Sequence, residues 1–151
     1  MENIEWFNDL RQYLLSHHQR PLRLKESALS YNVASFIEQR QSPSFSEKLL
    51  DFIDAKSLND TEVYKRAGID RKLFSKIRSH PNYQPKKKTA FLLCLGLQLT
   101  IEEADTLLRC AGYSFSNSHT LDLIVQYCIE QGIYEIIEIN FALEHYNIEP
   151  F

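Results

Sequence analysis

The residues between 56 and 88 are the part of this sequence whose side chains point most clearly to a chemistry. This stretch holds ten Lys or Arg residues against three acids, a formal charge of +7 in a chain of net charge −3. The remainder of the chain therefore carries −10. Cations at this density attract phosphate groups, and their uneven distribution says more about partners than the near-neutral total does. The sequence favours binding of a polyanion.

Catalysis and metal binding find little support. The chain has no glycine-rich phosphate loop, no Gly-x-Ser-x-Gly motif and no Cys/His pairing of useful spacing. None of its five histidines stands in an arrangement typical of a metal site, and Glu144 next to His145 is a weak signal alone. We expect a protein that is not an enzyme and that needs no cofactor and no metal.

The cysteines and the hydropathy indicate where the protein works. Cys94, Cys110 and Cys128 are odd in number and lie among apolar residues, so buried free thiols are expected and disulfides are not. No apolar run approaches the roughly 20 residues that a transmembrane helix needs, and the start of the sequence lacks the pattern of a secretion signal. We therefore expect a cytoplasmic protein with no membrane segment.

Apolar residues recur at helical spacing almost throughout, whereas two-residue alternation is hard to find, and this predicts an all-α fold. An N-terminal helical extension over residues 1–43 should contain a helix over 3–16, a polar break at 17–21 and a further helix. Five helices are expected in a domain over 44–113. A C-terminal pair of helices over 114–151 should pack on that core.

Start and stop signals mark the helices of the central domain. Pro85 stands where the first residue of a helix would, ahead of an apolar stretch that ends at Leu97. Three possible capping boxes mark other helix starts: Ser44 with Glu47, Asn59 with Glu62, and Thr100 with Glu103.

Two short helices joined by a tight turn are expected between Asn59 and Pro81. Gly68 supplies the left-handed backbone that such a turn requires, and Asp70 is the expected N-cap of the second helix. Phe74 and Ile77, three residues apart, fix the buried face of that helix. The side chains left pointing outward are Arg71, Lys72, Ser75 and Lys76.

The segment from Leu58 to Arg78 resembles the helix-turn-helix of XRE-type, phage-repressor-like DNA-binding domains. The resemblance covers about residues 44–113 and implies a five-helix core, a double-stranded DNA partner and a bacterial or phage transcriptional regulator that acts by occupying its operator. A homodimer on two half-sites is also implied. The residues that carry the likeness are the Ala67-Gly68-Ile69 turn, Asp70, the buried positions Val63, Ile69, Phe74 and Ile77, and the later stretch from Leu107 to Tyr113.

The resemblance also implies roles for the basic side chains. The N-terminal half of the second motif helix would enter the major groove, so the expected base readers are Arg71, Lys72, Ser75 and Lys76. Arg71 is the strongest candidate among them, because arginine pairs bidentately with guanine. The expected phosphate contacts are Lys65, Arg66, Arg78, Lys86, Lys87 and Lys88.

The three consecutive lysines carry a separate signal. Cations at a helix N-terminus oppose the helix dipole, each at a cost of about 0.3–1 kcal/mol when exposed. A local rule broken in this way favours an anionic ligand at Lys86–Lys88.

Two residues depart from the family pattern. Tyr64 stands where XRE-type domains commonly place a small alanine between the helices, and Asp60 stands where a glutamine often contacts phosphate. A module that binds RNA or a nucleotide, or a protein–protein adaptor in a regulatory or defence system, is therefore the alternative. The segment from Asp70 to Ser79 and its downstream residues also resemble a helical module that occurs in bacterial proteins, in some of them beside macro domains.

The last part of the chain has the opposite charge. From Cys110 to Phe151 there are six acids and no Lys or Arg, so these helices are expected to face protein and not phosphate. Core packing accounts for most of the aromatic residues here, and the others could serve a dimer or partner surface. The residues concerned are Tyr127, Tyr134, Phe141, Tyr146 and Phe151.

Overall fold

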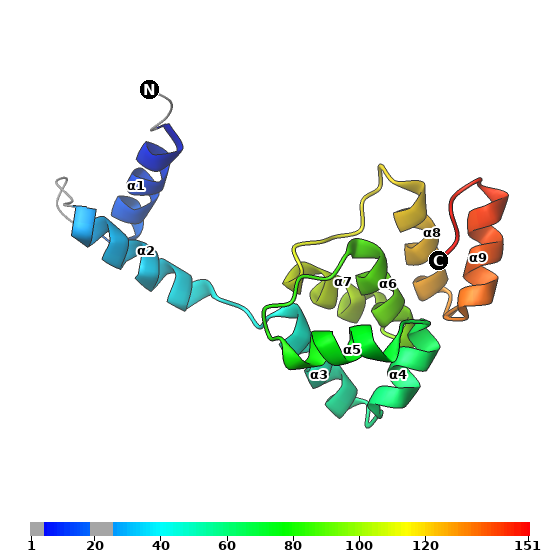
Figure 1. The fold of residues 1–151 in the computed structure, drawn as a ribbon. Coiled ribbons are helices and arrows are strands. Elements are labelled where there is room, and N and C mark those ends of the chain that lie inside the picture. The colour runs from blue at the N-terminus through cyan, green and yellow to red at the C-terminus, as the bar shows by residue number, and fades with distance from the viewer. Residues whose placement is uncertain (1–4, 19–25) are drawn as a thin grey trace. The chain divides into compact units, whose positions relative to one another are not determined.

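The computed structural model describes residues 5–18 and 26–151, and every regular element within them is a helix, which confirms the all-α prediction (Figure 1). The chain divides into two compact units with a boundary between Ser42 and Pro43. The helices are α1 (Glu5–His18), α2 (Glu26–Arg40), α3 (Phe45–Ala55), α4 (Asp60–Ala67), α5 (Arg71–Ser79), α6 (Lys87–Gly96), α7 (Ile101–Cys110), α8 (Thr120–Glu130) and α9 (Ile136–His145). No helix in the described part of the chain is long and apolar enough to span a bilayer.

The first unit is a pair of helices held by a small aromatic cluster. The ring of Tyr13 in α1 meets that of Phe36 in α2 edge-on, with 5.4 Å between centroids. The guanidinium of Arg40 lies 4.1 Å from the Phe36 centroid and donates a hydrogen bond to the Tyr13 hydroxyl. The prediction of a break from residue 17 was wrong at its start, because α1 continues through His18. The rest of that predicted break lies outside the described residues.

The second unit begins with helices whose caps follow the sequence signals. Ser44 Oγ accepts a hydrogen bond from the Glu47 backbone N–H, and Asn59 Oδ1 accepts one from Glu62. Thr100 caps α7 in the same way. Helices α3 to α7 occupy the region where five helices were predicted.

Helix α6 is the buried centre of this unit. Its residues Phe91 and Leu93 to Gly96 are shielded from solvent, and α4 packs along it more extensively than any other helix does. The prediction that α6 starts at Pro85 was wrong. Lys86 is the N-cap and Lys87 the first helical residue, while Pro85 is buried in the loop before them.

One glycine of α6 sets its distance from α4. A Cβ added to Gly96 would lie 2.9 Å from the Cβ of Ala67 and 2.9 Å from the carbonyl oxygen of Val63. Only hydrogen fits at Gly96, because backbone atoms cannot move aside cheaply. Gly96 and Ala67 therefore allow α4 and α6 to approach closely without a small residue at the position of Tyr64.

The thiols lie largely inside this unit. Cys94 and Cys128 are buried and Cys110 is half-buried, and all three are free. Burial raises the pKa of each thiol. The prediction of buried free thiols is thus confirmed for Cys94 and Cys128.

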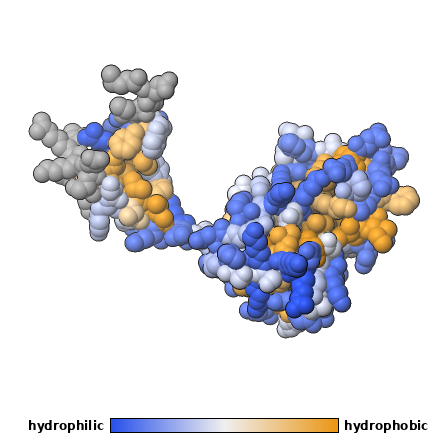
Figure 2. Space-filling model, in the orientation of Figure 1, coloured by the Kyte–Doolittle hydropathy of each residue, from blue (hydrophilic) through white to orange (hydrophobic). Residues whose placement is uncertain are grey.

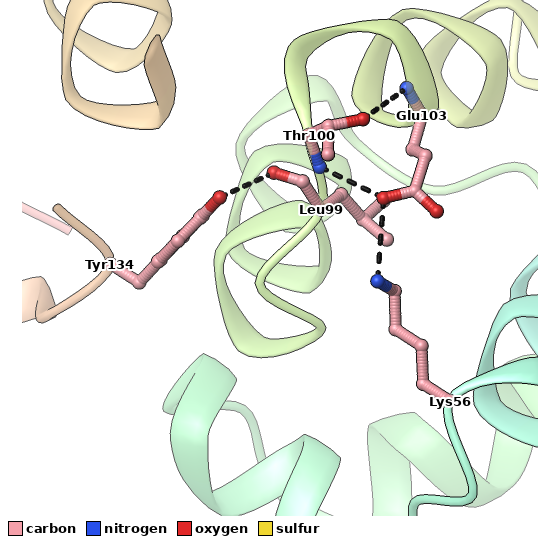
Figure 3. Close-up of polar contacts among 5 residues, drawn as sticks. All are labelled: Lys56, Leu99, Thr100, Glu103 and Tyr134. Atoms are coloured by element: carbon pink, nitrogen blue, oxygen red, sulfur yellow. Dashed lines mark hydrogen bonds and ion pairs between the residues drawn. The ribbon is translucent and has the colours of Figure 1, made fainter. Parts of the chain in front are cut away.

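Polar contacts tie the C-terminal helices to the rest of the unit (Figure 3). The Tyr134 hydroxyl, just before α9, donates a hydrogen bond of 2.7 Å to the Leu99 carbonyl oxygen. Nearby, the Glu103 carboxylate accepts hydrogen bonds from the Thr100 backbone N–H and from Lys56 Nζ, at 3.0 and 3.3 Å. The hydrogen bond from the Thr100 N–H is the main cause that lowers the pKa of Glu103. Burial partly opposes this pKa shift, and Lys56 adds to it. Burial, and secondarily the Glu103 charge, raises the pKa of Tyr134.

Candidate nucleic-acid interface

The predicted turn between α4 and α5 is present. Gly68 ends α4 with a φ of 67°, in the left-handed region, and its N–H bonds back to the last turn of the helix. Asp70 caps α5 through a hydrogen bond from the Lys72 backbone N–H to its Oδ1. Both local predictions are confirmed. The glycine turn and the Asp70 cap together fix the direction in which α5 leaves the turn and the face that α5 presents.

Helix α5 has one buried face and one basic face. Phe74 and Ile77 are buried in the core, as predicted, and Leu73 is half-buried. Val63 of α4 is buried as predicted too, whereas the prediction of a buried Ile69 was wrong, because this side chain of the turn is half-buried. At 100° per residue, the outward side chains fill an arc of about 160°. The exposed residues on that arc are Arg71, Lys72, Ser75, Lys76, Arg78 and Ser79.

The predicted base readers separate into two rows on this face. Lys72 and Lys76 follow one edge, and Lys76 Nζ lies 5.7 Å from the ring centroid of Tyr83. Arg71 and Ser75 form the other row, which faces α4 across a polar hollow of about 450 Å³. The lining of the hollow is Asp60, Thr61, Tyr64, Arg71, Phe74, Ser75 and Arg78.

Several cations of the motif have no anionic partner in the structure. Arg71 and Lys72 at the start of α5, and Lys65 and Arg66 at the end of α4, are exposed. Within residues 5–18 and 26–151, no carboxylate forms an ion pair with any of these four side chains. They lie on both sides of the Gly68 turn, so this part of the motif presents four exposed cations that are not held in ion pairs by described carboxylates.

Arg78, a predicted phosphate contact, lies in an ion pair. Its Nη1 is 2.7 Å from both carboxylate oxygens of Asp60 at the start of α4. Asp60, which stands where a glutamine that contacts phosphate was expected, is thus paired with an arginine of α5. Because both side chains remain more than one-third exposed, this pair contributes little to stability.

Two of the three lysines in the predicted cluster at Lys86–Lys88 form ion pairs with acids of the same chain. Lys87 Nζ is 2.5 Å from Oδ2 of Asp122 in α8, whose side chain is only 4% exposed. Lys88 makes a longer pair, 3.7 Å, with the exposed Glu149. Lys86, the N-cap, is exposed. The anion that the sequence favours at this helix start is supplied for Lys87 by Asp122.

Asp122 is a residue that the sequence interpretation missed. Besides Lys87, its Oδ2 accepts a 2.8 Å hydrogen bond from the Ser116 backbone N–H. This carboxylate thus joins α6, α8 and the loop between α7 and α8. The run of lysines was a signal for it, although nothing in the sequence pairs position 87 with position 122.

Tyr64 packs within the motif. It is half-buried, and its ring centroid lies 5.9 Å from that of Phe74 at a tilt of 48°. Tyr64 therefore forms an aromatic wall of the polar hollow on the α4 side.

The aromatic residues of the C-terminal region divide by exposure. Tyr134 and Phe151 are half-buried, and Phe151 is pinned to Asn140 by two hydrogen bonds between its backbone and the amide side chain. Tyr127, Phe141 and Tyr146 are 60%, 77% and 60% exposed. Core packing thus explains two of the five, so the expectation that it accounts for most of them was wrong, and three remain at the surface.

Comparison with known proteins gives no match: no family model, no curated protein and no solved structure shows a significant similarity to this chain.

Proposed function

We propose that residues 43–151 bind double-stranded DNA with α5 as the recognition helix, and that the protein regulates transcription by occupying an operator. The observation that carries this proposal is the exposed basic face of α5, which follows a left-handed glycine turn and presents Arg71 and Lys72. Neither side chain is in an ion pair with a carboxylate in the described part of the chain. Its dimensions and charge suit the major groove of DNA, and its buried face fixes the helix rigidly to the core.

In this proposal the side chains divide their work by position. Arg71 and Lys72 in the first turn of α5, with Ser75 and Lys76 in the second, contact base edges. Lys65, Arg66 and Lys86 hold the phosphate backbone and contribute affinity without sequence preference. Proteins of the XRE type, which the sequence resembles, commonly bind two half-sites as dimers, so a homodimer on DNA is part of the proposal.

The test is a salt titration on duplex DNA with two matched variants. If about five phosphates are neutralised, the log–log slope of affinity against salt should be near −4.5. Arg71→Ala should relax preference at one base pair by about 1–3 kcal/mol, whereas Lys65→Ala should weaken all sequences alike. No binding by the wild type at about 50 mM salt would reject the DNA proposal. Equal losses from both variants on every sequence would remove Arg71 from the base readers.

A second prediction follows from the ion pair between Arg78 and Asp60. Asp60→Asn removes one negative charge from the proposed interface and frees Arg78 to reach a phosphate. Affinity for random duplex should rise by about three- to tenfold at low salt, with a slope steeper by about 0.9. Glu62→Gln is the control, because it removes an exposed acid from the same helix without freeing an arginine. An equal gain from both variants would assign the effect to net charge and not to Arg78.

A second candidate function has an observation of its own. The hollow between α4 and α5 combines Arg71 and Ser75 with the aromatic wall of Tyr64, a set of groups suited to a phosphorylated ligand with a flat ring. Single-stranded RNA or a nucleotide is therefore the alternative ligand. Titration of the wild type with a nucleoside triphosphate and with single-stranded RNA, beside duplex DNA, ranks the three ligands directly.

A further inference from the structure

The C-terminal helices carry an apolar groove on the surface. Its volume is about 490 Å³. Its lining comes from α8 at i, i+3, i+4, i+7 and i+8 from Thr120, from α9 at Glu138 and Ala142, and from Ile133 and Tyr146 just before and after α9. The groove therefore follows both helices for about 12 Å, more than two turns. Figure 2 shows hydrophobic residues among hydrophilic ones on the visible face of the second unit. Ile137 and Phe141, each more than three-quarters exposed, extend the apolar surface beside it.

The end of the chain described here does not fill this groove. Phe151 is held by Asn140, through hydrogen bonds of 2.7 and 3.4 Å. On α9, position 140 lies about 160–200° around the helix from positions 138 and 142, which line the groove. The final residues therefore pack at the opposite side of α9 and do not cover the groove.

The charge around the groove is negative. Residues 110–151 contain no Lys or Arg. Two of their six acids face lysines of α6, since Asp122 pairs with Lys87 and Glu149 with Lys88. The other four are exposed carboxylates without an ion pair in the described part of the chain: Glu130, Glu135, Glu138 and Glu144. Glu138 also lines the groove itself.

We propose that the groove between α8 and α9 binds an amphipathic helix of a partner protein, with apolar side chains in the groove and Lys or Arg along its flanks. A trough between two helices, two to three turns long, accepts a third helix through anchors at i, i+3, i+4 and i+7. The unpaired carboxylates then select a basic partner and disfavour an acidic one. The site is independent of the DNA-binding proposal, because it uses no residue of α4 or α5.

The experiment uses two designed helical peptides of about 18 residues with the same leucine face, long enough to form a helix readily. One carries Lys on its flanks and the other Glu. Fluorescence anisotropy with the full chain should show binding of the Lys peptide, weakened by salt, and at least about tenfold weaker binding of the Glu peptide. Glu138→Lys combined with Glu130→Lys, at an exposed acid on α8 beside the groove-lining Leu123 and Tyr127, should reverse this preference. Asp51→Lys combined with Asp54→Lys, on the exposed face of α3, is the charge-matched control and should leave the preference unchanged.

Groove occupancy is tested by filling the trough. Ala142→Trp should reduce binding of the Lys peptide by at least about tenfold, and Tyr127→Ser, a change at a 60% exposed side chain that leaves the fold intact, should reduce it severalfold. Circular dichroism checks that each variant is folded. The proposal is overturned by no binding of the Lys peptide at about 1 mM, or by unchanged binding to both variants. Self-association of the wild type that Ala142→Trp abolishes would overturn it in favour of a second copy of this chain.

Discussion

Gly96→Ala is expected to lower the free energy of unfolding by about 3 kcal/mol, the upper end of the usual cost of overpacking a core. The added methyl would lie 2.9 Å from the backbone nitrogen of Ala67 and from the carbonyl oxygen of Val63, so α4 and α6 would have to separate. The gain in helix propensity, about 1 kcal/mol in isolation, works in the opposite direction. Urea unfolding followed by far-UV circular dichroism measures the net change.

Gly112→Ala is the matched control for Gly96→Ala. Gly112 has a φ of 79°, but nothing lies within 4 Å of a Cβ built there. Only backbone strain of about 1–2 kcal/mol is expected. An unchanged midpoint for Gly96→Ala would show that the two helices do not approach as closely as described.

Lys87→Ala should destabilise the second unit by about 3 kcal/mol, the lower end of the cost of leaving a buried carboxylate without its partner. The lower end applies because the Lys87 side chain is 32% exposed, whereas that of Asp122 is 4% exposed. Lys88→Ala is the matched control. Its pair with Glu149 is long and exposed, so a change within about 0.5 kcal/mol is expected. Thermal or urea unfolding of both variants gives the comparison.

A double variant separates the two roles considered for Lys87. In Lys87→Ala combined with Asp122→Asn, the amide oxygen can still accept the Ser116 N–H while the buried charge is gone, so much of the lost stability should return. A phosphate contact predicts another result, in which Lys87→Ala weakens DNA binding and leaves the unfolding free energy unchanged. That outcome would contradict the structural role of Lys87.

The features that the sequence determined by itself are local. Ser44, Asn59 and Asp70 cap their helices through backbone N–H groups two or three residues away, and Gly68 adopts the left-handed turn. Each of these contacts depends on residue type and spacing within one helical turn. The apolar period fixed the buried face of α5 in the same way, and so it also fixed which basic side chains are exposed.

Only the tertiary structure decided which charges already have partners. Asp60 meets Arg78 and Lys87 meets Asp122 across 18 and 35 residues, and no local spacing rule encodes either distance. The same holds for the fit of Gly96 against Ala67 and for the groove between α8 and α9. These contacts arise when helices pack side by side, and packing depends on the complementary shapes of surfaces formed by residues far apart in the chain. The basic stretch was evident from composition, but packing determined that Arg78 and Lys87 form ion pairs, whereas Arg71 and Lys72 form none with the residues that the structure describes.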